Sequence, residues 1–257
     1  MFDLLTAFGG GLDGVIVLFL AFVSFFASLL TAVFGLGGGI LMMVVLSYFV
    51  PVAASVPVHG VVQLGSNAGR AALQIRYVQW QVVWPFLGGA FIGSALASVT
   101  LVQLPDWVLL GALGVFVLTT LWVEIPALSN PSSRSYLVGG GLSTFCTFFV
   151  GATGPLIASL LRQGPFSRFE KVASHAFLMT IQHGLKLVVF GILGFQFGQW
   201  VGLIVLLVVA GFLGTTMGTR LLGRISAKLF EQGVKWILTL LALDMLRRAV
   251  VIWLQAA

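Results

Sequence analysis

Apolar stretches fill almost the whole chain, and a polar segment at residues 126–135 divides them into two groups of five. They lie at 15–34, 40–50, 52–73, 82–101 and 107–123, and then at 136–150, 155–161, 172–194, 201–217 and 234–254. A helix needs about 20 apolar residues to cross the hydrocarbon core of a bilayer, so most stretches are long enough, but the second and the seventh are too short. The pattern predicts an all-α integral membrane protein with about ten hydrophobic helical segments, some of them short broken helices.

The two groups of stretches repeat each other. Six residues of the first group recur 116 positions later (175 − 59 = 116): Thr31, Gly35, Gly38, His59, Arg70 and Trp84 match Thr147, Gly151, Gly154, His175, Lys186 and Trp200. After a further shift of about five positions, Phe91-Ile92-Gly93 matches Phe212-Leu213-Gly214. We therefore divide the chain into a first membrane repeat at 1–125, a cytoplasmic linker at 126–135 and a second membrane repeat at 136–257, which together form one transmembrane domain.

Charged residues in the loops indicate how the repeats are oriented. In the second half, two alternate loops carry most of the cations, namely Arg162, Arg168 and Lys171 in one and Arg220, Arg224 and Lys228 in the other. The equivalent loops of the first half, around Pro51 and Pro105, have no Lys or Arg, whereas Arg76 lies in a loop whose second-half counterpart is uncharged. Since cytoplasmic loops are enriched in Lys and Arg, the opposite bias predicts inverted-topology repeats with both chain ends outside. Arg247 and Arg248 do not fit this scheme, because it places them towards the outer end of the last span.

Composition agrees with a membrane location. Of the 257 residues, 59% are hydrophobic and 8% are charged, and the mean hydropathy is +1.11. A soluble domain carries about a quarter charged residues, so the lipid bilayer is the expected surroundings. The net charge of +6 is spread along the chain and forms no basic run with interleaved aromatic residues, which excludes a nucleic-acid partner.

Polar residues in the third and eighth stretches form two matched helical faces. Spacings of three and four residues align His59, Gln63, Ser66, Asn67, Arg70 and Gln74 in one stretch, and His175, Thr180, Gln182, His183 and Lys186 in the other. Arg70 could still reach the membrane surface from a span end, but Lys186 lies near the middle of its stretch with no carboxylate nearby in sequence. A mobile anionic substrate is the simplest counter-ion.

Glycine-rich breaks precede both short stretches. They read Gly35-Leu36-Gly37-Gly38-Gly39 and Gly151-Ala152-Thr153-Gly154-Pro155. Helices that begin near Gly38 and Gly154 would direct free N–H groups and a positive dipole end at the membrane centre, which favours a negative group. The candidate substrate-binding residues are therefore Gly37, Gly38, Gly39, His59, Gln63, Asn67, Arg70, Thr153, Gly154, His175, Gln182, His183 and Lys186.

These residues favour a transporter that works by alternating access, with other classes left open. An anion channel would use a continuous polar path through the same residues. An intramembrane hydrolase would need Ser66 beside His59 or His183, and no Gly-x-Ser-x-Gly-like context surrounds that serine. The three histidines have no Asp, Glu or Cys beside them in either helix, so we expect no metal, no cofactor and no enzymatic activity.

The segment Phe34-Gly35-Leu36-Gly37-Gly38-Gly39, its second copy Val150-Gly151-Ala152-Thr153-Gly154-Pro155 and the duplicated layout resemble the sulfite exporter TauE/SafE family. The resemblance implies a small multi-pass transporter of the bacterial inner membrane. Its implied cargo is sulfite or an organosulfonate, commonly moved out of the cell. A homo-oligomer is possible.

Overall fold

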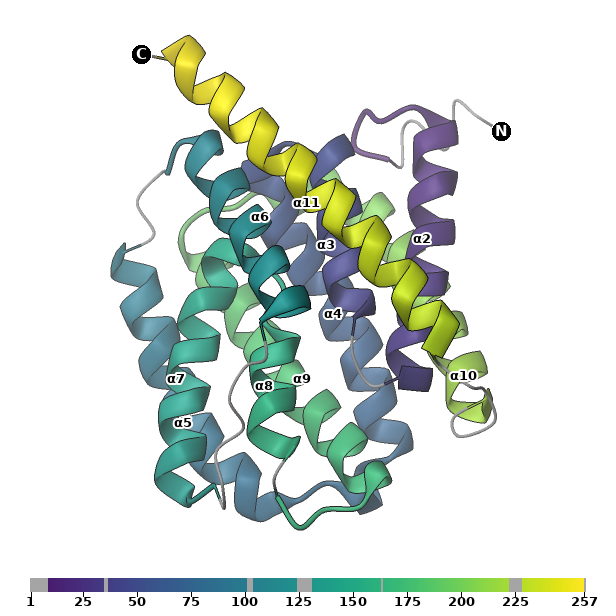
Figure 1. The fold of residues 1–257 in the computed structure, drawn as a ribbon, viewed down its shortest axis with the longest axis vertical. Coiled ribbons are helices and arrows are strands. Elements are labelled where there is room, and N and C mark those ends of the chain that lie inside the picture. The colour runs from purple at the N-terminus through teal and green to yellow at the C-terminus, as the bar shows by residue number, and fades with distance from the viewer. Residues whose placement is uncertain are drawn as a thin grey trace.

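The computed structural model is a bundle of helices (Figure 1) and describes residues 9–34, 37–100, 104–123, 131–162, 164–221 and 228–256. The first half contains α2 (Gly14–Phe34), α3 (Gly38–Phe49), α4 (Val52–Leu73), α5 (Trp80–Thr100) and α6 (Asp106–Trp122). The second contains α7 (Ser133–Val150), α8 (Gly154–Arg162), α9 (Arg168–Ile192), α10 (Val201–Leu221) and α11 (Lys228–Ala256). Short 3-10 helices, η1 (Ile75–Tyr77) and η2 (Phe197–Trp200), precede α5 and α10. The predicted all-helical fold is confirmed, while Gly35, Leu36, linker residues 126–130 and Arg224 lie outside the described residues.

Helix lengths separate spanning helices from broken ones. Within the described ranges, four segments are long and apolar enough to cross a membrane, namely Gly14–Val33, Trp80–Thr100, Arg168–Ile192 and Phe197–Leu221. The helices α3 and α8 have 12 and 9 residues, which confirms that the second and seventh stretches are too short to span. The 22-residue α4 has sufficient length, but its polar face lowers its hydropathy.

The helix boundaries repeat as the sequence predicted. A separation of 116 residues links three pairs of boundaries. It links the last residues of α2 and α7, the first residues of α3 and α8 (154 − 38 = 116), and the first residues of α4 and α9. The helices α5 and α10 are 121 residues apart at each end (201 − 80 = 121), so the additional five residues lie before α10. The match of Trp84 with Trp200 is therefore wrong, because Trp84 lies exposed inside α5, whereas Trp200 is buried at the end of η2.

The two halves pack reciprocally. The helix α5 lies along α7 just as α10 lies along α2, while α4 packs against α9 and α6 against α11. Glycines allow the closest approaches, since a Cβ atom on Gly89 would lie 1.8 Å from the Leu137 carbonyl oxygen, and one on Gly214 would lie 2.0 Å from the Phe25 carbonyl oxygen. These two glycines therefore serve close helix packing.

The repeats run in opposite directions. In Figure 1, α2 descends and α3 returns upwards, whereas α7 ascends and α8 returns downwards. Each pair forms a helical hairpin with a glycine break at its tip, and the two hairpins enter the bundle from opposite ends. The start of α2 and the end of α11 lie at the same end of the bundle, as ten alternating segments require.

The two arginines of α11 that did not fit the loop-charge scheme have partners within the fold. The Arg247 guanidinium forms an ion pair with Asp244 (2.7 Å), and the Arg248 guanidinium lies 4.9 Å from the centre of the Tyr48 ring. The Tyr48 hydroxyl donates a hydrogen bond to Asp244 (3.0 Å). These arginines therefore help to attach α11 to α3, a role that a count of loop charges does not consider.

Candidate functional site

The polar faces of α4 and α9 are buried against each other at the centre of the bundle. Eight predicted residues on them are each at most 5% exposed: His59, Gln63, Asn67, Arg70, His175, Gln182, His183 and Lys186. The pair of Asp244 with Arg247 is the one salt bridge found among the described residues, so neither Arg70 nor Lys186 has a carboxylate partner there. Burial of two cationic side chains without a carboxylate is costly unless another group supplies negative charge.

A small cavity of about 20 Å³ lies where the two glycine breaks meet these faces. Eight of the thirteen predicted residues line it: Gly37, Gly39, His59, Gln63, Asn67, Gly154, His175 and His183. The sequence analysis missed five others, Thr31, Ile40, Ala152, Pro155 and Met179. Thr31 could have been found, because the duplication matches it with Thr147, whereas the apolar residues give no sequence signal that distinguishes them from packing residues.

Two histidines hold the short helices in related ways. His59 Nε2 lies 2.9 Å from the Gly39 carbonyl oxygen, and His175 Nε2 lies 3.1 Å from the Gly154 carbonyl oxygen. Because a carbonyl oxygen only accepts hydrogen bonds, Nε2 of each ring carries the proton. Each long helix is thereby attached to the first turn of the short helix in its own repeat.

His183 has unused hydrogen-bonding capacity. Its ring is fully buried and lines the cavity, and neither nitrogen forms a hydrogen bond with any described residue. The His59 ring lies edge-on to it, with 5.8 Å between ring centres, and Nδ1 of His175 also has no partner in the described part of the chain. Buried polar groups are nearly always satisfied, so these nitrogens indicate a place for a polar guest.

The two cations lie directly behind the cavity wall. Lys186 Nζ donates a hydrogen bond to the Gly151 carbonyl oxygen (2.9 Å), at a position where the backbone has φ +79°. Arg70 donates to Asn67 Oδ1 (2.5 Å), and its Nε has no partner within the described ranges. Neither side chain lines the cavity. Arg70 contacts Asn67, which does line it, and Lys186 contacts the glycine break of the second repeat.

Three further predicted residues also lie behind the wall. Thr153 donates to Gln182 Oε1 (3.0 Å), and Gln182 in turn donates to Thr144 of α7 (3.3 Å). Gly38 packs on α2, where a Cβ atom would lie 1.7 Å from the Ala27 carbonyl oxygen. These three residues hold the two glycine breaks in position and do not line the cavity.

Ser66 lies on a different side of α4. Its hydroxyl is 3.1 Å from the hydroxyl of Ser28 on α2 and 3.1 Å from that of Thr215 on α10. The geometry therefore gives no support to a serine–histidine dyad, because the serine is engaged by hydroxyls of two other helices.

The electrostatics of the cavity favour a negative guest. Residues at the first turns of α3 and α8 line it, so the positive ends of two helix dipoles lie at its wall. Arg70 and Lys186 lie behind the wall, and neither has a carboxylate partner among the described residues. A small anion with several acceptor oxygens fits this arrangement.

A family model described as sulfite exporter TauE/SafE matches residues 20–245. No curated protein and no solved structure matches the chain. The matched range includes both glycine breaks, both polar faces and every residue that lines the cavity.

Proposed function

Because the chain belongs to the sulfite exporter TauE/SafE family, we propose that it exports a small anion, sulfite or an organosulfonate, across the bacterial inner membrane. Family membership supports a multi-pass membrane transporter, and the residues supply the preference for an anion. The observation that carries the proposal is the cavity lined by two helix N-termini and backed by two cations without carboxylate partners among the described residues.

We assign the charge-binding role to Arg70 and Lys186 and the hydrogen-bonding role to the residues that line the cavity. His183 supplies direct contacts, because its two ring nitrogens have no partner among the residues that the structure describes. The remaining substrate-binding residues of this proposal are Gly37, Gly38, Gly39, His59, Gln63, Asn67, Thr153, Gly154, His175 and Gln182.

The proposed mechanism is alternating access. The cavity of about 20 Å³ has room for about one water molecule, so an oxyanion requires the two hairpins to move apart. Since they enter the bundle from opposite ends, rocking one repeat against the other would open the cavity to each side in turn. The end of the bundle that carries Arg162, Arg168 and Lys171 would face the cytoplasm.

A ligand screen on the purified protein tests this proposal. Sulfite, thiosulfate and sulfoacetate should raise the apparent melting temperature, because a ligand that binds only the folded state stabilises it, by about 2.7 kcal/mol at 100 times its dissociation constant. Carboxylate analogues, zwitterionic taurine and chloride should raise it less. Equal shifts for chloride and sulfite would indicate a general salt effect, and the absence of a shift with every sulfur anion would contradict the substrate class.

A further inference from the structure

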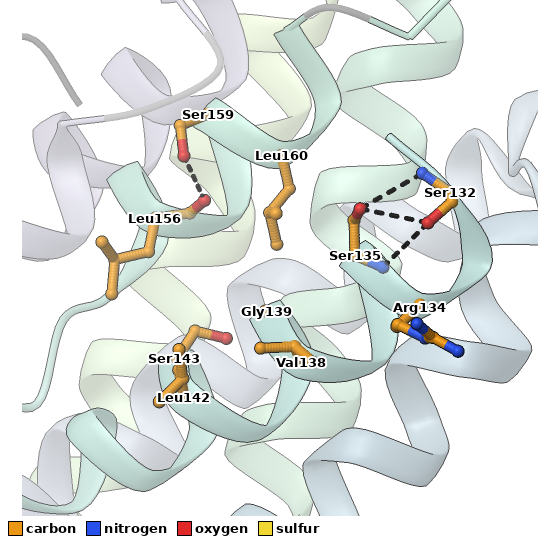
Figure 2. A pocket seen from close by; sticks show the side chains of 10 residues that line it. All are labelled: Ser132, Arg134, Ser135, Val138, Gly139, Leu142, Ser143, Leu156, Ser159 and Leu160. Atoms are coloured by element: carbon orange, nitrogen blue, oxygen red, sulfur yellow. Dashed lines mark hydrogen bonds between the residues drawn. The ribbon is translucent and has the colours of Figure 1, made fainter. Parts of the chain in front are cut away.

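A second and larger hollow lies outside the bundle centre, between α7 and α8 (Figure 2). This α7–α8 groove has a volume of about 500 Å³. Hydroxyl and guanidinium groups of Ser132, Arg134 and Ser135 lie at one end of it, and mainly apolar side chains such as Leu142 and Leu156 line the other. The groove is therefore amphipathic along its length.

The equivalent groove of the first repeat, between α2 and α3, has a different lining. Phe19, Phe22, Val23 and Phe26 line it 116 residues before Ser135, Val138, Gly139 and Leu142 (135 − 19 = 116). Three phenyl rings thus occupy positions where the second repeat has a hydroxyl, a valine and a leucine. Both repeats therefore have a hollow at this position, but the hollow of the second repeat is lined by smaller or polar side chains where the first has aromatic rings.

Among the described residues, a third helix lines only one of the two grooves. Ile237 and Leu241 of α11 line the groove of the first repeat. The counterpart of α11 in the first repeat is α6, and no residue of α6 is among the described residues that line the α7–α8 groove.

The polar end has the chemistry of a phosphate site. The exposed guanidinium of Arg134 has no hydrogen bond to any described residue, and it stands on the first turn of α7. Ser132 and Ser135 cap that turn through each other (3.4 Å from Ser135 N to Ser132 Oγ), which holds the helix start in place. An arginine at the positive end of a helix binds phosphate oxygens well.

The length of the groove matches one lipid tail. On α7 its lining extends from residue 132 to residue 143 (143 − 132 = 11), which at about 1.5 Å per residue is about 16 Å. This is close to half of a hydrocarbon core of about 30 Å, the depth that an acyl chain from one leaflet reaches. The polar end is also the end at which Lys171 and Arg162 lie, where Lys171 Nζ donates to the Arg162 carbonyl oxygen (2.7 Å).

We propose that the α7–α8 groove binds one anionic phospholipid, with its phosphate on Arg134 and an acyl chain between the two helices. The occupant is anionic because the polar end offers a cation that has no partner among the described residues. A bound lipid would pack against the hairpin whose tip contains Thr153 and Gly154, so it should stabilise that hairpin against the rest of the bundle.

The test measures the melting temperature of the purified full-length protein in detergent during titration with phosphatidylglycerol or with phosphatidylcholine of the same acyl chains. Phosphatidylglycerol should stabilise the protein at the lower concentration. The Arg134→Gln variant should raise the half-saturating phosphatidylglycerol concentration about tenfold, as expected for one lost hydrogen bond to a charged group. Val138→Trp, which fills the groove, should remove the response to each lipid.

Two variants serve as matched controls. Arg220→Gln removes an exposed arginine from the last turn of α10, and Val115→Trp adds a ring to an exposed position outside the groove. Each should respond to lipid as the unmodified protein does. Equal stabilisation by the two lipids, or equal effects of Arg134→Gln and Arg220→Gln, would overturn the proposal. A dimer that Val138→Trp disrupts without any effect of lipid would do so too, because a second copy of the chain would then occupy the groove.

Discussion

Replacing Lys186 with methionine should weaken anion binding and transport at least about 100-fold while the protein still folds. Two unit charges about 4 Å apart interact by about 4 kcal/mol at an effective dielectric constant of 20, and this attraction disappears with the ammonium group. Methionine keeps much of the apolar volume, which matters because the Lys186 side chain fills the space above Gly60. The Gly151 carbonyl oxygen keeps a partner, since the Thr147 hydroxyl also donates to it (3.0 Å).

The control for this variant is Lys235→Met. Lys235 lies on α11 with its ammonium group 3.9 Å from the centre of the Trp122 ring, and it does not line the cavity. Transport should remain near the unmodified level. The readouts are the dissociation constant of sulfite for the purified protein and its flux in proteoliposomes, with gel filtration to confirm folding. Unchanged sulfite affinity in a folded Lys186→Met protein would remove the charge-binding role from this residue.

Neighbouring glycines of the first break should respond in opposite ways. A Cβ atom on Gly39 would lie 3.6 Å from Gln63 Oε1, an ordinary contact, so Gly39→Val should fold and fill the small cavity. Transport should then be lost without a marked fall in melting temperature. By contrast, a Cβ atom on Gly38 would overlap the Ala27 carbonyl oxygen on α2, so Gly38→Ala should destabilise the hairpin by about 1–3 kcal/mol.

A valine at Gly88 is the matched control, because a Cβ atom there has its nearest neighbour 4.0 Å away on Leu137. This variant should fold and transport normally. Melting curves and sulfite flux of the three proteins give the comparison. Normal flux through Gly39→Val would mean that the anion does not pass through this cavity.

The sequence predicted the helices well because apolar length and glycine breaks are local signals. The match between Gly38 and Gly154 predicted helices that begin near these two residues, and α3 and α8 do begin there. The five-residue insertion was placed only approximately, since Trp84 and Trp200 share a residue type and a spacing without sharing an environment. Identity at one position cannot reveal which side of a helix faces lipid.

The candidate site was predicted in part for a related reason. Helical spacing places His59, His183 and Asn67 on a buried face, and they do line the cavity. It does not determine where a long side chain ends, so it could not show that Lys186 reaches the Gly151 carbonyl oxygen. Nor could it show that Ser66 faces two other helices, because that depends on how the whole bundle packs.

Counterflow in proteoliposomes tests the central claim most directly. Vesicles that contain the purified protein are loaded with unlabelled sulfite and diluted into a trace of labelled sulfite. An alternating-access transporter should take up label transiently above its equilibrium level, with a rate that saturates as the external concentration rises. An uptake rate that rises linearly with external sulfite and does not depend on internal sulfite would indicate a channel. Uptake no faster than in protein-free vesicles would contradict transport of sulfite altogether.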